Sequence, residues 1–170
     1  MILLFYMHKG GCNKVMPCNQ AKFELISRIR LTYVLAAFLA FIYGTTIYAF
    51  FRDLNIVLFQ FIPKPSFLAS LRIPLKTETI WGYLFTFNLP HGLWCLSGLL
   101  VIRAIWLTNI KWRAIYGVIF IVAISSLEIS QLNEKRFGTF DVLDLVFYGA
   151  STLVESVIFN MFVKRKERKR

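Results

Sequence analysis

Long apolar runs alternate with short polar segments along most of this chain. The clearest run covers residues 31–51 and contains no charged residue. A helix of that length extends about 30 Å, which matches the thickness of the hydrocarbon core of a bilayer. Arg28 and Arg30 precede the run, and Arg52 and Asp53 end it. The pattern predicts a first membrane-spanning helix over residues 31–51.

The second apolar run, residues 80–102, is interrupted by the sequence NLPHG at positions 88–92. One interpretation is a kinked helix that starts near Ile80. The other is a helix that starts at residue 89 and reaches about residue 107, because proline suits the first helical turn, where its missing N–H has no partner to lose. We prefer the second interpretation, in which Arg103 extends its side chain toward the cytoplasmic surface.

Two further runs, residues 114–132 and 142–163, predict the third and fourth spans. The connection between them is short and contains Gly138, so these two spans should form an antiparallel hairpin. Residues 53–78, by contrast, hold three prolines, which forbid a continuous spanning helix and predict a loop. The predicted fold is all-α: a polytopic membrane protein with a bundle of four transmembrane helices and a proline-containing loop between the first two.

Composition supports this class. Hydrophobic residues make up 57% of the chain, whereas a soluble domain has about 45–50%. The net charge of +11 would suggest nucleic acid as the partner of a soluble protein. Here the basic residues flank apolar runs, so the lipid bilayer is the predicted partner and no nucleic-acid binding is expected.

The distribution of lysine and arginine predicts the orientation. The N-terminal segment 1–30 carries five of them, residues 103–113 carry three, and the tail 164–170 carries six. On the opposite side, the proline-containing loop with Arg52 carries four and the connection before the fourth span carries two. Basic residues concentrate on the cytoplasmic side of bacterial membrane proteins. Both termini are therefore predicted to be cytoplasmic, and the proline-containing loop is predicted to be extracytoplasmic.

Acidic and amide residues gather where the third span ends and the fourth begins. Glu128 and Gln131 are three residues apart and share a helical face, and Asp141 and Asp144 have the same spacing. Together with residues nearby in the predicted bundle, they should converge on one outward-facing pocket formed by His91, Glu128, Gln131, Arg136, Asp141 and Asp144. Simpler roles stay open. His91 could cap the second span or form a hydrogen bond with a neighbouring residue, and Asp141 and Asp144 could cap the N-terminus of the fourth span.

A polar stripe continues along the fourth span through Tyr148, Ser151 and Glu155. Lipid would reject such a stripe, because a carboxylate at depth costs several kcal/mol or becomes protonated. The stripe should therefore face other helices or a hydrated cavity. Glu155 should be partnered or neutral, and hydrogen bonding between helices would account for it equally well.

The chain resembles the VanZ-like family of small bacterial membrane proteins. The resemblance lies in LEISQL at 127–132, in RFGTFDVLDLVFYGAS at 136–151 and in LPHGLW at 89–94. It implies a multi-span protein of the bacterial cytoplasmic membrane, and some relatives are associated with resistance to glycopeptide antibiotics such as teicoplanin. Tyr148 and Gly149 stand where family members often carry asparagine and glycine.

Three classes of function remain. The preferred one is a non-enzymatic envelope protein that binds a lipid-linked or glycopeptide ligand, with carboxylates accepting hydrogen bonds and Arg136 contacting anionic groups. An intramembrane enzyme acting on lipid or cell-wall precursors is the second, with His91 and a carboxylate in acid–base chemistry. The third is a small subunit of a membrane transport complex. Since no zinc-protease or serine-elbow motif occurs, no metal, cofactor or catalytic residue is predicted, and the oligomeric state stays open.

Overall fold

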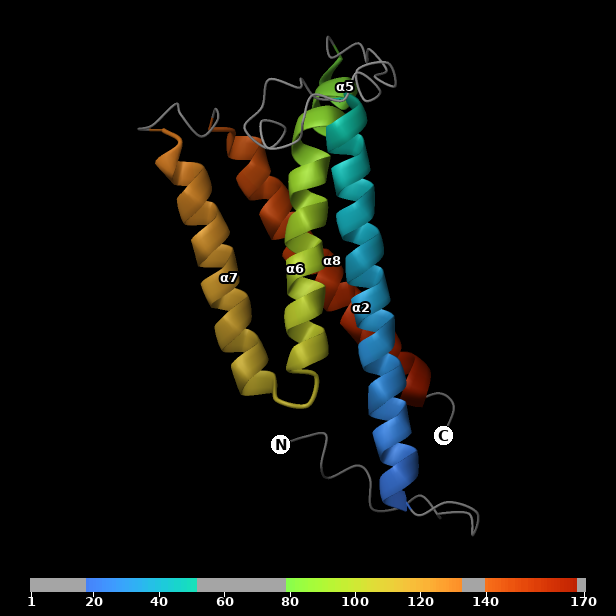
Figure 1. Ribbon diagram of the computed structural model, residues 1–170. Coiled ribbons are helices and arrows are strands. Elements are labelled where there is room, and N and C mark those ends of the chain that lie inside the picture. The colour runs from blue at the N-terminus through green and yellow to red at the C-terminus, as the bar shows by residue number, and fades with distance from the viewer. Residues whose placement is uncertain (1–17, 52–78, 133–139, 168–170) are drawn as a thin grey trace, which may run out of the picture.

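Every element in the described part of the chain is a helix (Figure 1). The computed structural model describes residues 18–51, 79–132 and 140–167. Within these ranges, four helical stretches are long and apolar enough to cross a membrane. The prediction of an all-α, multi-pass membrane protein with four spans is confirmed, and a lipid bilayer suits its apolar helices. The predicted proline-containing loop lies outside the described residues.

Four spans arise from six helical elements. In chain order these are α2 (Cys18–Phe51), α5 (Ile80–Tyr83), the π-helix η1 (Leu84–Asn88), α6 (Leu89–Ile105), α7 (Ile110–Ser130) and α8 (Val142–Glu167). Since α5, η1 and α6 follow without a break, they form one span, Ile80–Ile105. Successive spans run in opposite directions (Figure 1). We call the end of the bundle where α7 ends and α8 begins the distal end, and the opposite end, where α2 begins, the proximal end.

The first helix is longer than predicted. α2 begins at Cys18, whereas the apolar run begins at residue 31. Residues 18–30 contain neither glycine nor proline, and several of them are good helix formers, so the helix extends beyond its apolar part. In the same way α8 continues past the predicted limit at residue 163 to Glu167. The apolar pattern therefore marks the lipid-embedded part of each helix rather than the helix ends.

The main helix contact joins α2 to the second span, and the two lie side by side, with the first turns of α2 extending beyond the end of α6 (Figure 1). Its buried core contains Tyr33 and Ala37 of α2 and Leu100 and Ala104 of α6. Small residues at such contacts let two helix backbones approach closely. α2 and α6 also approach closely nearer the distal end, where a Cβ added to Gly44 would lie 3.1 Å from the Trp94 ring.

The second span combines the two interpretations of its sequence. Helical backbone begins at Ile80, as the kinked-helix interpretation has it, but regular α-helix begins at Leu89 with Pro90 in its first turn. A proline removes one N–H and its ring collides with the carbonyl group four residues earlier. The wider π-helical turn relieves this conflict, because the N–H of Leu89 donates to the carbonyl of Leu84, five residues back. The preferred start at residue 89 was therefore too late for the span.

The third span has the fewest contacts with the others. Only 6% of its apolar window is buried within the protein, against 44% for the second span. One close approach to α6 exists, where a Cβ added to Gly98 would lie 2.3 Å from the ring of Phe120. Most of α7 therefore presents apolar side chains to the surrounding lipid.

Candidate functional site

The start of α8 is held by Asp141. Its Oδ1 accepts a hydrogen bond from the N–H of Leu143 at 2.9 Å, and its carbonyl accepts one from the N–H of Asp144 at 3.1 Å. These are bonds of a helix N-cap, so the capping interpretation describes Asp141. Asp144 lies in the first turn, where negative charge is favourable, but its side chain bonds elsewhere.

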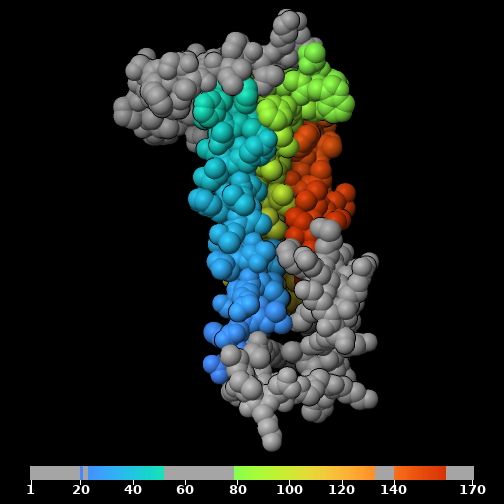
Figure 2. All heavy atoms as spheres, turned by 90° about the vertical axis from the view of Figure 1, so that its right-hand side faces the viewer, coloured from blue at the N-terminus to red at the C-terminus, as the bar shows by residue number. Residues whose placement is uncertain are grey.

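Side chains of the second span meet both aspartates. The hydroxyl of Tyr83 donates to Oδ2 of Asp141 at 2.8 Å. The amide of Asn88 donates to Asp141 Oδ2 and to Asp144 Oδ1, each at 2.9 Å. Asn88 is completely buried, so this amide ties the π-helical turn to the start of α8. Figure 2 shows the α5–η1 segment in green at the distal end, next to the orange start of α8.

These contacts also set the ionisation of Asp141. Burial raises the pKa of this carboxyl group, but hydrogen bonds from Asn88, the Leu143 N–H and Tyr83 outweigh the effect of burial. The pKa of Asp141 therefore lies below its ordinary value, and the group is a carboxylate at neutral pH.

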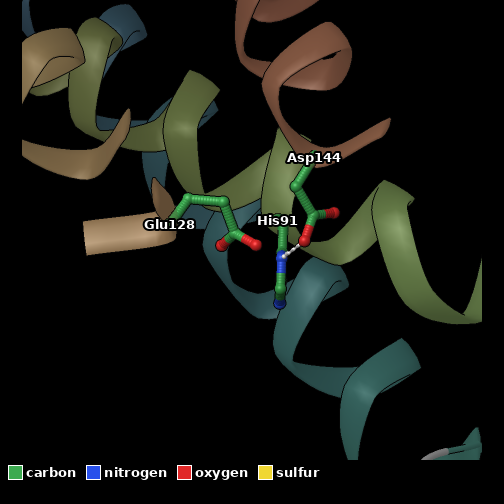
Figure 3. Close-up of side chains that lie close together, drawn as sticks. All are labelled: His91, Glu128 and Asp144. Atoms are coloured by element: carbon green, nitrogen blue, oxygen red, sulfur yellow. Dashed lines mark hydrogen bonds and ion pairs between the residues drawn. The ribbon is translucent and has the colours of Figure 1, made fainter. Parts of the chain in front are cut away.

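His91 is oriented by Asp144. Its Nδ1 lies 2.7 Å from Asp144 Oδ2 (Figure 3). An ionised carboxylate only accepts hydrogen bonds, so with Asp144 in that form Nδ1 carries the proton of this pair. The imidazole also packs against two neighbouring aromatic rings, with centroid distances of 6.4 Å to Tyr48 and 5.6 Å to Trp94. Such a fixed imidazole leaves Nε2 as the nitrogen available to a ligand or a proton.

Glu128 reaches the cluster from the end of α7 and is 3% exposed. Its Oε1 accepts a hydrogen bond from the N–H of Asp141 at 3.1 Å. Its Oε2 accepts one from Nε2 of Gln131 at 3.3 Å. Glu128 thus links the last turn of α7 directly to the first residue before α8.

We define the distal cluster as the five residues Asn88, His91, Glu128, Asp141 and Asp144. Three of its members point toward one another in Figure 3: His91 from α6, Glu128 from α7 and Asp144 from α8. Each offers one ligand atom, and these atoms all lie within 4.8 Å of one another. One imidazole nitrogen and two carboxylate oxygens are a donor set that divalent metals such as Zn²⁺ accept.

The predicted pocket residues can now be placed. The structure brings together His91, Glu128, Gln131, Asp141 and Asp144 at the distal end. Arg136 lies outside the described residues. Asn88 and Tyr83 were not predicted as site residues. The spacing of Asn88 and His91, three apart on one helical face, was the available signal for Asn88.

The polar stripe of α8 faces the second span. Ser151 is buried, and its hydroxyl lies 2.7 Å from the carbonyl oxygen of Gly92. Tyr148 is half-buried. Glu155 is buried and forms an ion pair with Arg103 of α6. Arg103, predicted to extend toward the cytoplasmic surface, is instead buried within the bundle, because a carboxylate on the neighbouring helix provides a partner.

No family model, no curated protein and no solved structure matches this chain. The geometry of the distal cluster and the residue pattern of the chain are thus the basis for assigning a function.

Proposed function

We propose that this protein is a VanZ-like protein of the bacterial cytoplasmic membrane. Its distal cluster faces the cell exterior and binds the polar part of lipid-linked cell-wall material or of a glycopeptide such as teicoplanin. One observation carries the proposal: three carboxylates gather at one end of the bundle, one of them bonded to His91, and no lysine or arginine of the described residues pairs with them. Each carboxylate oxygen already accepts a hydrogen bond within the protein, but all except Oδ2 of Asp141 have a second lone pair that can accept one from a hydroxyl, amide or ammonium group of a ligand.

The orientation rests on the distribution of charge. At the proximal end lie the start of α2, the connection between α6 and α7, and the end of α8 (Figure 1). The sequence next to these three points holds most of the lysines and arginines. The positive-inside rule then assigns the proximal end and both termini to the cytoplasm. Under this assignment a ligand reaches the distal cluster from the outer face of the membrane.

The proposal predicts that neutral isosteres at the cluster weaken ligand binding while preserving the fold. In Glu128→Gln and Asp144→Asn the side chains keep their size and lose their charge. We expect each variant to weaken binding of teicoplanin or of a purified lipid-linked cell-wall precursor about tenfold, since a charged hydrogen bond is lost. Bacteria expressing either variant should lose any reduced teicoplanin susceptibility that the unaltered protein confers.

The matched control is Glu24→Gln, which removes an exposed carboxylate near the proximal end of α2. This variant should behave like the unaltered protein in both assays. If folded Glu128→Gln and Asp144→Asn proteins bind and protect as well as the control, the proposed ligand site is wrong.

A second function is favoured by the pairing of His91 with Asp144 and by the nearby Glu128. An oriented imidazole beside a carboxylate suits acid–base chemistry, and the three ligand atoms suit a divalent metal. In this alternative the protein is an enzyme that acts on lipid or cell-wall precursors at the outer face.

Metal analysis of the purified protein separates these functions. The enzyme alternative predicts about one equivalent of a divalent metal. Asp144→Asn should lose this metal, because His91 and Glu128 alone leave only two of the three protein ligands. Asp141→Asn should keep the metal, since Asp141 lies outside the group of three ligands. The binding proposal predicts substoichiometric metal in all three proteins, and a stoichiometric metal would favour the enzyme.

A further inference from the structure

A groove of about 430 Å³ opens between α6, α7 and α8, on the part of the bundle that carries Arg103 rather than the distal cluster. Its walls are mostly apolar and include Leu99 of α6 and Val118, Ile121 and Val122 of α7. Its polar lining contains two arginines, Arg103 and Arg113, together with Thr152 and Glu155. An apolar groove with two arginines suits an amphipathic ligand with a negatively charged head group.

Arg103 has an unmet hydrogen-bonding group in this groove. It is only 6% exposed, and its Nε is taken by Glu155. Its Nη1, however, is buried and has no hydrogen-bond partner among the described residues. A buried guanidinium N–H without an acceptor is costly, because the group has lost water and gained nothing in return. An acceptor bound in the groove would remove that cost.

Arg113 adds a positive charge that Glu155 does not neutralise. In the described part of the chain no carboxylate forms an ion pair with Arg113. Its guanidinium lies 4.9 Å from the ring centroid of Phe159, and that of Arg103 lies 4.1 Å from the same ring. The shared ring draws both cations to one part of the groove. Two guanidinium groups against one carboxylate leave the groove with an excess of positive charge.

Aromatic side chains indicate the depth of these arginines in the membrane. Trp106, Trp112 and Tyr116 pack against one another beside the connection between α6 and α7, with centroid distances of 5.3 to 6.0 Å. Tryptophan and tyrosine concentrate at the level of lipid head groups. Arg103 and Arg113 are within three residues of this aromatic cluster in sequence, so they lie close to the head-group level of that leaflet.

We propose that the groove binds one anionic phospholipid. The phosphate contacts Arg113 and the free Nη1 of Arg103, and one acyl chain runs along α7 from Arg113 to Val122, a distance of about 13 Å at 1.5 Å per residue. The lipid completes the hydrogen bonding of Arg103 and covers the side of α6 and α8 that α7 leaves open. This site is separate from the distal cluster and does not depend on the proposed ligand there.

The first test removes the head-group contact. The protein is reconstituted into nanodiscs of equal phosphatidylglycerol and phosphatidylcholine, and native mass spectrometry measures the lipids that remain bound. We expect about tenfold enrichment of phosphatidylglycerol, lost in Arg113→Gln, since a charged contact to phosphate is worth about one decade in affinity. The control Lys111→Gln removes an exposed charge two residues away that does not line the groove, and should retain the enrichment.

The second test fills the groove. A Cβ added to Gly117, which lines the groove, meets no atom within 4 Å. Gly117→Leu should therefore fold normally, as judged by helical content and elution volume, and should exclude the acyl chain of either lipid. The matched control is Gly149→Leu on α8, where an added Cβ also meets nothing within 4 Å and which lies outside the groove.

Several results would overturn the proposal. These are equal retention of both lipids by the unaltered protein, equal loss in Arg113→Gln and Lys111→Gln, or unchanged lipid retention in Gly117→Leu. Displacement of phosphatidylglycerol by inorganic phosphate would identify a site for free anions instead. A dimer that Gly117→Leu dissociates without loss of lipid would identify a second copy of the chain as the occupant of the groove.

Discussion

At the scale of single residues, several buried polar side chains in the described part of the chain find partners on other helices. Asn88 bonds to aspartates 53 and 56 positions away, and Tyr83 bonds to one 58 positions away. Glu155 is 52 positions from Arg103. The sequence indicates that a buried Glu155 needs a partner, but pairs at such separations cannot be identified from spacing along one helix. For the same reason Tyr83 escaped prediction as a site residue, whereas the spacing of Asn88 from His91 was an available signal that was not used.

The ion pair between Arg103 and Glu155 makes a residue-scale prediction. Glu155→Ala leaves a buried guanidinium without its carboxylate, and we expect a loss of about 3–5 kcal/mol in the free energy of unfolding. The double variant Arg103→Met, Glu155→Leu removes both charges and keeps similar volumes, so most of the stability should return. Unfolding of the purified protein by detergent titration, followed by circular dichroism, measures both values. Equal destabilisation of the single and double variants would show that packing rather than charge dominates.

At the scale of elements, the existence of the four spans followed from the apolar runs, because the bilayer fixes the number of apolar residues that a spanning helix needs. Helix ends were predicted less well. In α2 and α8 the helix continues into polar sequence, which hydropathy does not register but helix propensity permits. In the second span, Pro90 was correctly expected in the first turn of a regular helix, yet the π-helical turn before it was not foreseen. Thr86 and Asn88, two residues of that turn, are both fully buried.

At the scale of the whole molecule, the distal cluster exists only because three spans meet. His91, Glu128 and Asp144 come from α6, α7 and α8, and no single helix holds more than one of them. The spacing of Glu128 with Gln131 and of Asp141 with Asp144 indicated two polar helix ends. The hairpin formed by α7 and α8 made their meeting predictable. The inclusion of His91 depended on the direction of the second span.

The two ends of the molecule differ in charge. Carboxylates dominate the distal cluster, whereas the groove beside Arg103 and Arg113 has an excess of positive charge. This polarity agrees with the proposed orientation, in which the arginines meet anionic head groups of the cytoplasmic leaflet. The distal cluster then meets ligands from outside the cell. Both proposals therefore depend on which way the bundle lies in the membrane.

Site-directed cysteine labelling tests that orientation most directly. In a chain whose three cysteines are replaced by serine, one new cysteine is placed at Leu132, exposed at the distal end, or at Thr108, exposed between α6 and α7. A membrane-impermeant maleimide should label Leu132→Cys in intact bacterial spheroplasts and should label Thr108→Cys only after the membrane is opened. Labelling of Thr108→Cys alone in intact spheroplasts would place the distal cluster in the cytoplasm and contradict an outward-facing ligand site.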